Sequence, residues 1–89
     1  MRSVPNVPDP LEVALRALAV SLGDDQRAGR LLALTGLTPD DLRHRAAERD
    51  VLVAVLRFLE DHEPDLLAVA AALELKPQEL VAARSALEA

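Results

Sequence analysis

The chain has 89 residues, which is enough for a single hydrophobic core. It has no cysteine, so disulfides, thiolate chemistry and cysteine-based zinc sites are excluded. Its formal net charge of −5 lies in the second half, because residues 1–45 carry six basic and six acidic residues whereas residues 46–89 carry four and nine. An acidic half repels phosphate backbones and anionic membranes, which argues against nucleic acid and membranes as partners.

Leucine and alanine dominate the composition, with 18 and 16 copies, while glycine occurs three times and Phe58 is the sole aromatic residue. Both dominant residues favour helices. The composition therefore predicts an all-α fold, a single compact orthogonal bundle of five or six short helices. No uninterrupted apolar run exceeds eight residues, whereas a membrane span needs about twenty. Because the N-terminal residues also lack the apolar core of a signal peptide, we expect a cytoplasmic protein.

Residues 1–8 contain two Val-Pro pairs and are expected to form a flexible tail, which leaves residues 9–89 as the single helical domain. Asp9 and Pro10 then form a helix start, with the aspartate as cap and the proline at the first helical position. The first helix is predicted over residues 10–22. Its apolar stripe, expected to face the core, consists of Leu11, Leu15, Leu18 and Leu22.

A second helix is predicted over residues 25–35, ended by Gly36. Gly29 lies inside this helix, where glycine costs about 1 kcal/mol relative to alanine. We interpret this glycine as the site of a close helix crossing, with Ala68 and Ala72 as the facing residues.

The stretch 32–46, "LALTGLTPDDLRHRA", joins two amphipathic runs by a tight turn, as helix–turn–helix DNA readers do. The helix that follows the Thr38 cap would then be the reading helix. Its first residues include Asp40 and Asp41, whose carboxylates oppose phosphates and base edges. The basic residues that follow are Arg43, His44, Arg45 and Arg49. A divergent DNA-binding regulator is therefore kept as the alternative function.

A fourth helix is predicted over residues 51–61, capped by Asp50, and eight of the nine residues 51–59 are apolar. A helix that is apolar on every side is buried or meets a partner. One interpretation places this helix in a central hairpin with the next one, wrapped by the others. The other interpretation gives it a surface for another chain. The candidate partner surface consists of Val51, Val53 and Phe58, with Arg43, Arg45 and Arg49 at the preceding junction.

The last two helices are predicted over residues 64–74 and 77–88, opened by "EPDLL" and "KPQEL". The segment "LTPDDL" at 37–42 is echoed by "LKPQEL" at 75–80. This echo predicts a loose internal duplication of a three-helix unit.

The cluster "EDHEPD", residues 60–65, offers carboxylates and a histidine but no looped pattern that would let them converge on one ion. We interpret it as a solvated helix end. The chain has no nucleophile elbow and no glycine-rich phosphate loop. We therefore expect no enzyme activity, no catalytic residues, no cofactor or metal, and no small-molecule substrate.

Four segments together resemble a family of short alphaproteobacterial proteins that is described only as a domain of unknown function. The most specific is "LALTGLTPDDLR", residues 32–43. The others are "AVLRFL" at 54–59, the Ala-rich run 66–75 and the ending "PQELVAARSAL" at 77–87. The chain has Leu31 and Leu32 where other members often have an aromatic residue. The resemblance implies a compact helical fold and brings no activity and no functional residues.

The leading hypothesis is a non-enzymatic cytoplasmic protein-interaction module or a small homo-oligomer. In the dimeric version the partner is a second copy bound through the fourth helix, and Val53→Asp would abolish the dimer. The DNA-binding regulator is the alternative. An accessory subunit of an enzyme, with a small pocket, is the third hypothesis.

Overall fold

The computed structural model describes residues 9–89, and the predicted tail at residues 1–8 lies outside the described residues. Over this range the chain forms six helices and no strand, which confirms the all-α bundle. The helices are α1 (Pro10–Leu22), α2 (Asp25–Thr35), α3 (Pro39–His44), α4 (Arg49–Asp61), α5 (Glu63–Leu73) and α6 (Pro77–Glu88). None of these helices combines the length and the apolar character that crossing a membrane would require.

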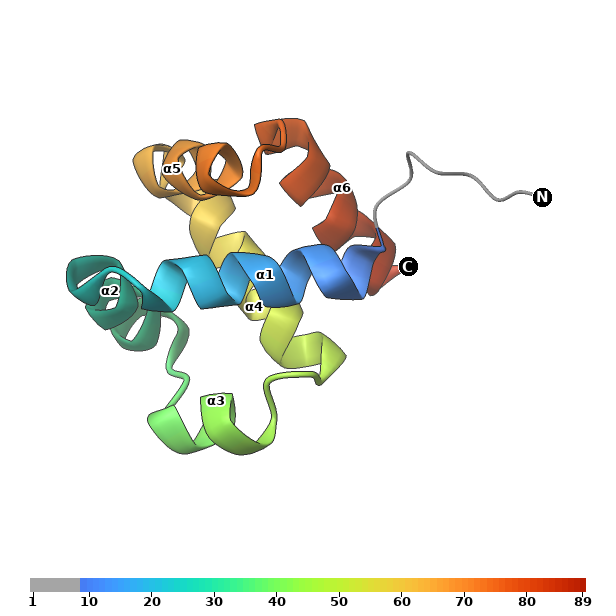
Figure 1. Ribbon diagram of the computed structural model, residues 1–89. Helices are drawn as coiled ribbons and strands as arrows, with labels where there is room; N and C mark the ends of the chain where they lie inside the picture. The colour runs from blue at the N-terminus through green and yellow to red at the C-terminus, as the bar shows by residue number, and fades with distance from the viewer. Residues whose placement is uncertain (1–8) are drawn as a thin grey trace.

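The centre of the bundle is formed by α1, α4 and α6, each of which packs against the other two. Figure 1 shows α1 crossing in front of α4, with α2 at one end, α5 and α6 on one side and α3 apart on the other. The core is richest along α4, where Leu52, Val55, Leu56 and Leu59 are fully buried. The predicted central hairpin is wrong: α4 lies at the centre but keeps one side open to solvent, and α5 leaves Leu67 exposed and takes an outer position.

The inward side of α1 is not the predicted leucine stripe. Its buried residues are Val13, Ala14, Ala17, Leu18 and Ser21. Small side chains on this side suit a helix that packs on α4, α5 and α6 at once, because bulky ones would hold the helices apart. Of the four predicted leucines only Leu18 is buried, so the prediction is wrong for Leu11, Leu15 and Leu22.

Local signals place most helix starts where the sequence predicts them. Asp9 caps α1 by accepting a hydrogen bond from Leu11 N at 3.0 Å, and Thr38 caps α3 in a capping box with Asp41. The start of α4 differs, because this helix begins at Arg49 and its N-cap residue makes no side-chain hydrogen bond. Asp50, the predicted cap, lies in the first turn instead. The carboxylate of Asp50 is held by Arg45, which lies between α3 and α4.

The glycines of α2 have different roles from each other. Gly36 ends the helix with a φ of 79°, a left-handed conformation that a side chain strains, as predicted for a helix stop. Gly29 has open space around the position of a Cβ atom. The predicted close crossing at Gly29 is therefore wrong, and Ala68 and Ala72 are exposed on α5.

Candidate interaction surface

The three apolar residues predicted for a partner surface divide between core and surface. Val51 is 1% exposed and Phe58 is 3% exposed, so their side chains pack inside the bundle. Val53 is half-buried and packs at the edge of the core. An apolar run with a single polar residue does not reveal which side faces inward, and the helix turns Val51 and Phe58 toward the core. A partner surface on α4 therefore excludes these two residues and retains Val53.

The three arginines predicted for the partner surface differ in the ion pairs that they form. Arg43 is exposed and forms an ion pair with Asp40 on the same helix. Arg45 contacts Glu48 at 2.9 Å, Asp41 at 3.2 Å and Asp50 at 2.9 Å. The hydrogen bonds to Glu48 and Asp41 raise the pKa of Arg45 above its ordinary value. Arg49 is exposed and makes no ion pair with any residue from 9 to 89.

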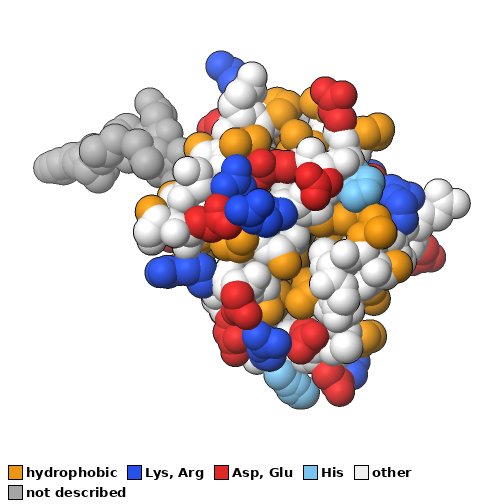
Figure 2. Space-filling view, turned by 180° about the vertical axis from the view of Figure 1, so that it is seen from behind, with side chains coloured by type: hydrophobic (Ala, Val, Ile, Leu, Met, Phe, Trp, Pro, Cys, Tyr) orange, Lys and Arg blue, Asp and Glu red, His pale blue; other side chains and the backbone are white. Residues whose placement is uncertain are grey.

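The outward face of α4 consists of Arg49, Asp50, Val53, Ala54, Arg57 and Asp61, all exposed or half-buried. Figure 2 shows the molecule from behind, where hydrophobic side chains reach the surface near the centre and beside a histidine, between groups of acidic and basic residues. Two concave areas flank the outward face of α4. The shallower one, about 590 Å³, lies toward the end of α6 and is bordered by Val53 and Leu87.

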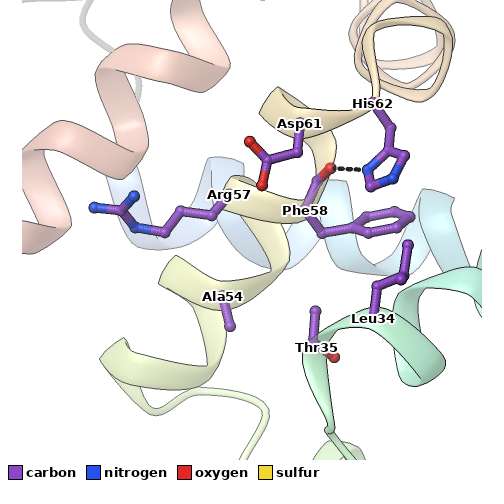
Figure 3. A pocket seen from close by; sticks show the side chains of 7 residues that line it. All are labelled: Leu34, Thr35, Ala54, Arg57, Phe58, Asp61 and His62. Atoms are coloured by element: carbon purple, nitrogen blue, oxygen red, sulfur yellow. Dashed lines mark hydrogen bonds between the residues drawn. The ribbon is translucent and has the colours of Figure 1, made fainter.

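The second concave area, here called the α2–α4 hollow, has a volume of about 230 Å³. Its lining residues are Leu34, Thr35, Ala54, Arg57, Phe58, Asp61 and His62. Leu34, near the end of α2, is 60% exposed, the highest value among the large hydrophobic residues of the described chain. Figure 3 shows its side chain directed toward the rings of Phe58 and His62. The hollow therefore joins an exposed leucine to an aromatic wall.

The wall of the α2–α4 hollow is fixed by a local contact between α4 and the start of α5. His62 Nδ1 lies 2.8 Å from the carbonyl oxygen of Phe58, so the ring nitrogen donates its proton to that oxygen. The two rings lie 4.8 Å apart between centroids and are tilted by 32°. Because Nδ1 already donates to the Phe58 carbonyl oxygen, Nε2 is the ring nitrogen of His62 that could hydrogen-bond to a bound group.

The two charged residues at the rim of the hollow, Arg57 and Asp61, differ in whether they form an ion pair. Arg57 points away from the hollow toward α6 and donates to Glu88 at 2.6 and 3.0 Å (Figure 3). Hydrogen bonds from Arg57 and from Arg84 hold the pKa of Glu88 below its ordinary value. Asp61 is exposed and makes no ion pair with the residues described. The net free charge at the rim is therefore negative.

A buried ion pair anchors α5 to α2 and was missed by sequence reasoning. Asp65 is 5% exposed and accepts hydrogen bonds from Arg27 at 2.9 Å and from Arg30 at 2.7 and 2.9 Å. Burial opposes ionisation of this carboxyl, but the hydrogen bonds from Arg30 and Arg27 outweigh burial and lower its pKa. The sequence signal for this contact is the spacing of Arg27 and Arg30, which lie three residues apart and therefore on one side of α2.

A second pair of helices, α4 and α6, is also joined by charge. Arg84 of α6 donates to Glu60 of α4 at 2.6 and 3.0 Å and to Glu88 at 2.6 Å. These hydrogen bonds raise the pKa of Arg84 above its ordinary value. The arrangement ties α4 to α6 beside the outward face of α4.

The acidic cluster at residues 60–65 does not converge. Glu60 bonds to α6, Asp61 faces outward and Asp65 is turned toward α2. Across residues 9–89, no group of three or more histidine or acidic side chains is placed to hold a metal ion. The interpretation as a solvated helix end holds for Asp61 and is wrong for Asp65.

Two residues of the hollow were also missed by sequence reasoning, Leu34 and His62. Leu34 lies three residues after the buried Leu31, and the helical period alone allows both to face inward. The sequence places His62 in the acidic cluster at residues 60–65, whereas its ring packs against Phe58.

Comparison with protein families matches residues 8–89 to a family described as "Protein of unknown function (DUF3572)". No curated protein and no solved structure matches the chain.

Proposed function

The chain belongs to the DUF3572 family, and we propose that it is a non-enzymatic, cytoplasmic protein-interaction module that binds a partner protein at the α2–α4 hollow. The observation that supports this proposal is the pairing of an exposed Leu34 with an apolar concavity beside the outward face of α4. Exposed apolar surface next to a hollow is the usual character of a protein-binding site.

The size of the hollow favours a side chain of a partner over a metabolite. Pockets for small molecules commonly enclose about 300–1,000 Å³. The α2–α4 hollow has about 230 Å³ and is open to solvent on one side. One apolar side chain from a partner would fill it and cover Leu34 at the same time.

The charge around the hollow favours a partner segment with basic residues beside its apolar anchor. Asp61 at the rim forms no ion pair within residues 9–89, and residues 46–89 carry the whole net charge of −5. Charge complementarity of this kind mainly raises the association rate and the specificity. Binding is therefore expected to weaken as the salt concentration rises.

The test compares three immobilised chains, the wild type, Leu34→Asp and Leu67→Asp, against lysate of the source organism, with bound proteins quantified by mass spectrometry. Leu67 is the matched control because it is 47% exposed but lies on α5, away from the hollow. We expect at least one protein to be retained by the wild type and the control and to fall roughly tenfold on Leu34→Asp.

That protein is then purified and titrated against the wild type and Asp61→Asn. A weaker complex with Asp61→Asn, and a smaller salt dependence, would support the basic partner segment. Retention that is equal on all three chains, or absent from all three, contradicts the proposal.

A mobility-shift assay on genomic DNA fragments at low salt distinguishes the DNA-binding alternative from the proposed interaction module. Arg43 and Arg45 already contact carboxylates of their own segment, which leaves Arg49 as the exposed cation with no ion pair among the described residues of this region. We expect no retained DNA at micromolar protein. If the protein retards the DNA and Arg43→Ala weakens this binding, the DNA-binding regulator is supported and the interaction module is contradicted. A thermal-shift panel of metabolites tests the accessory-subunit hypothesis in the same way.

A further inference from the structure

The side-chain hydrogen-bond donors that line the α2–α4 hollow are already used within the chain. Arg57 donates to Glu88 at 2.6 and 3.0 Å. The hydroxyl of Thr35 donates to the carbonyl oxygen of Leu31 at 2.6 Å. Nδ1 of His62 donates to a backbone carbonyl oxygen at 2.8 Å. The other lining residues, apart from one aspartate, are apolar, so a bound group meets no free side-chain donor among the residues that line the hollow.

Two acceptors remain at the hollow, on the consecutive residues Asp61 and His62. Asp61 is exposed and forms no ion pair within residues 9–89. A neutral histidine ring that carries its proton on Nδ1 has an acceptor at Nε2. Figure 3 shows both side chains near the end of α4, across the hollow from Thr35. A group that satisfies both acceptors must therefore donate two hydrogen bonds.

The contact between α4 and α6 leaves the charge of Asp61 open to a partner. Arg57 precedes Asp61 by four residues, a spacing at which opposite charges on one helix commonly pair. Glu88 of α6 takes this arginine instead, and Figure 3 shows its guanidinium directed away from Asp61. The carboxylate of Asp61 therefore lacks the cation that its own helix offers, and a cation from outside the chain suits it.

A guanidinium suits these two acceptors better than an ammonium does. The guanidinium of arginine carries five N–H donors in one plane, so its nitrogens can donate to two neighbouring acceptors at once. The ammonium of lysine is a compact and strongly hydrated point charge. A hydrogen bond between a cationic donor and a carboxylate is also stronger than one between neutral groups. The two acceptors and the negative charge together favour arginine.

We propose that the partner segment presents an arginine whose guanidinium donates to the carboxylate of Asp61 and to Nε2 of His62. The apolar side chain beside this arginine enters the hollow and covers Leu34. The inference rests on the proposed function, since it identifies the basic residue of that partner segment. Asp61 and His62 then determine specificity, because they select arginine among the residues that can lie beside the apolar anchor.

The test titrates the full chain with short probes and follows its backbone amide signals by NMR at pH 8, above the range in which histidine ordinarily titrates. The probe is acetyl-leucyl-arginine amide. In its two controls lysine or citrulline replaces arginine, and citrulline has a neutral urea of similar shape. We expect the arginine probe to shift the amides of Leu34, Asp61 and His62, but not that of Leu67, with a dissociation constant of about 1–10 mM. Both controls should bind about three- to fivefold more weakly.

Variants of the chain identify the two acceptors. Asp61→Asn removes the charge, and His62→Phe keeps a ring beside Phe58 but removes Nε2. Each should weaken the arginine probe about three- to fivefold and leave the citrulline probe nearly unaffected. Glu63→Gln is the matched control, because it removes the same charge from an exposed residue that does not line the hollow. It should bind the arginine probe as the wild type does.

The outcomes separate this inference from the proposed function. Equal binding of the arginine and citrulline probes at the hollow overturns the arginine and retains an apolar binding site. Equal binding of the arginine and lysine probes shows recognition of charge alone and also overturns it. If no probe shifts the amides of the hollow at about 20 mM, the inference is overturned, whereas the proposed function is still decided by retention on Leu34→Asp.

Discussion

The inner helices α1, α4 and α6 and the outer helices α2 and α3 are held in place by different forces. The inner helices supply most of the buried side chains, and α4 does so without a side-chain cap. The outer helices bury one residue, Leu31, between them, yet both begin with a side-chain cap. Burial dominates at the centre of this small domain, although Asp9 also caps α1 and Arg84 joins α6 to α4. The outer helices bury little, so caps and ion pairs account for more of what holds them.

The largest expected effect is Leu56→Ala in α4. Leu56 is fully buried, so its truncation leaves a cavity and should lower the free energy of unfolding by about 2–5 kcal/mol. Leu42→Ala in α3 is the comparison, because Leu42 is only half-buried at the edge of the core. Urea unfolding of both variants measures the difference. Equal costs would mean that α3 belongs to the centre after all.

The second prediction concerns the link between an outer helix and α5. Asp65→Asn removes the carboxylate that accepts from Arg27 and Arg30, and we expect the free energy of unfolding to fall by about 1–3 kcal/mol at pH 7. Asp61→Asn is the control, since Asp61 is exposed and makes no ion pair among residues 9–89. It should leave the stability nearly unchanged.

The pH dependence of the same variant sharpens the test. The pKa of Asp65 is lower in the folded chain than in the unfolded chain, so the folded state favours the ionised form. Its stabilising effect is complete above the unfolded pKa of about 3.9 and is lost as the pH falls through the lower folded value. The difference between wild type and Asp65→Asn should therefore shrink below about pH 4. A constant difference from pH 7 to pH 2 would contradict the ion pair.

The third prediction isolates a cap of the outer region. Thr38→Ala removes the hydroxyl that accepts from Asp41 N at 3.0 Å. Loss of an N-cap costs about 0.5–2 kcal/mol locally, but because α3 buries no residue the global stability should fall by about 1 kcal/mol at most. Hydrogen exchange should accelerate over residues 39–45 and remain unchanged in α4. Acceleration that spreads evenly over the whole chain would place α3 in the same cooperative unit as the centre.

The same contrast explains how far the sequence predicts the structure. Caps and prolines are local signals, and they place α1, α2, α3 and α6 correctly. Burial depends on neighbours that are distant in sequence, so the inward side of α1 and the positions of Val51 and Phe58 could not be read from periodicity. The candidate site follows this rule: Arg49 is exposed and Val53 is half-buried, whereas Leu34 and His62 belong to the hollow only because α2 packs beside α4.

The smallest expected effect comes from Gly29→Ala in α2, and it has the opposite sign. The position is exposed, helical and open around the new Cβ atom, so alanine should raise the free energy of unfolding by about 0.5–1 kcal/mol. Gly36→Ala is the matched control, because its φ of 79° strains any side chain and the substitution should destabilise. Urea midpoints that move in opposite directions would confirm that helix propensity and termini, rather than packing, govern α2. A destabilising Gly29→Ala would instead show that another surface packs closely on this side of α2.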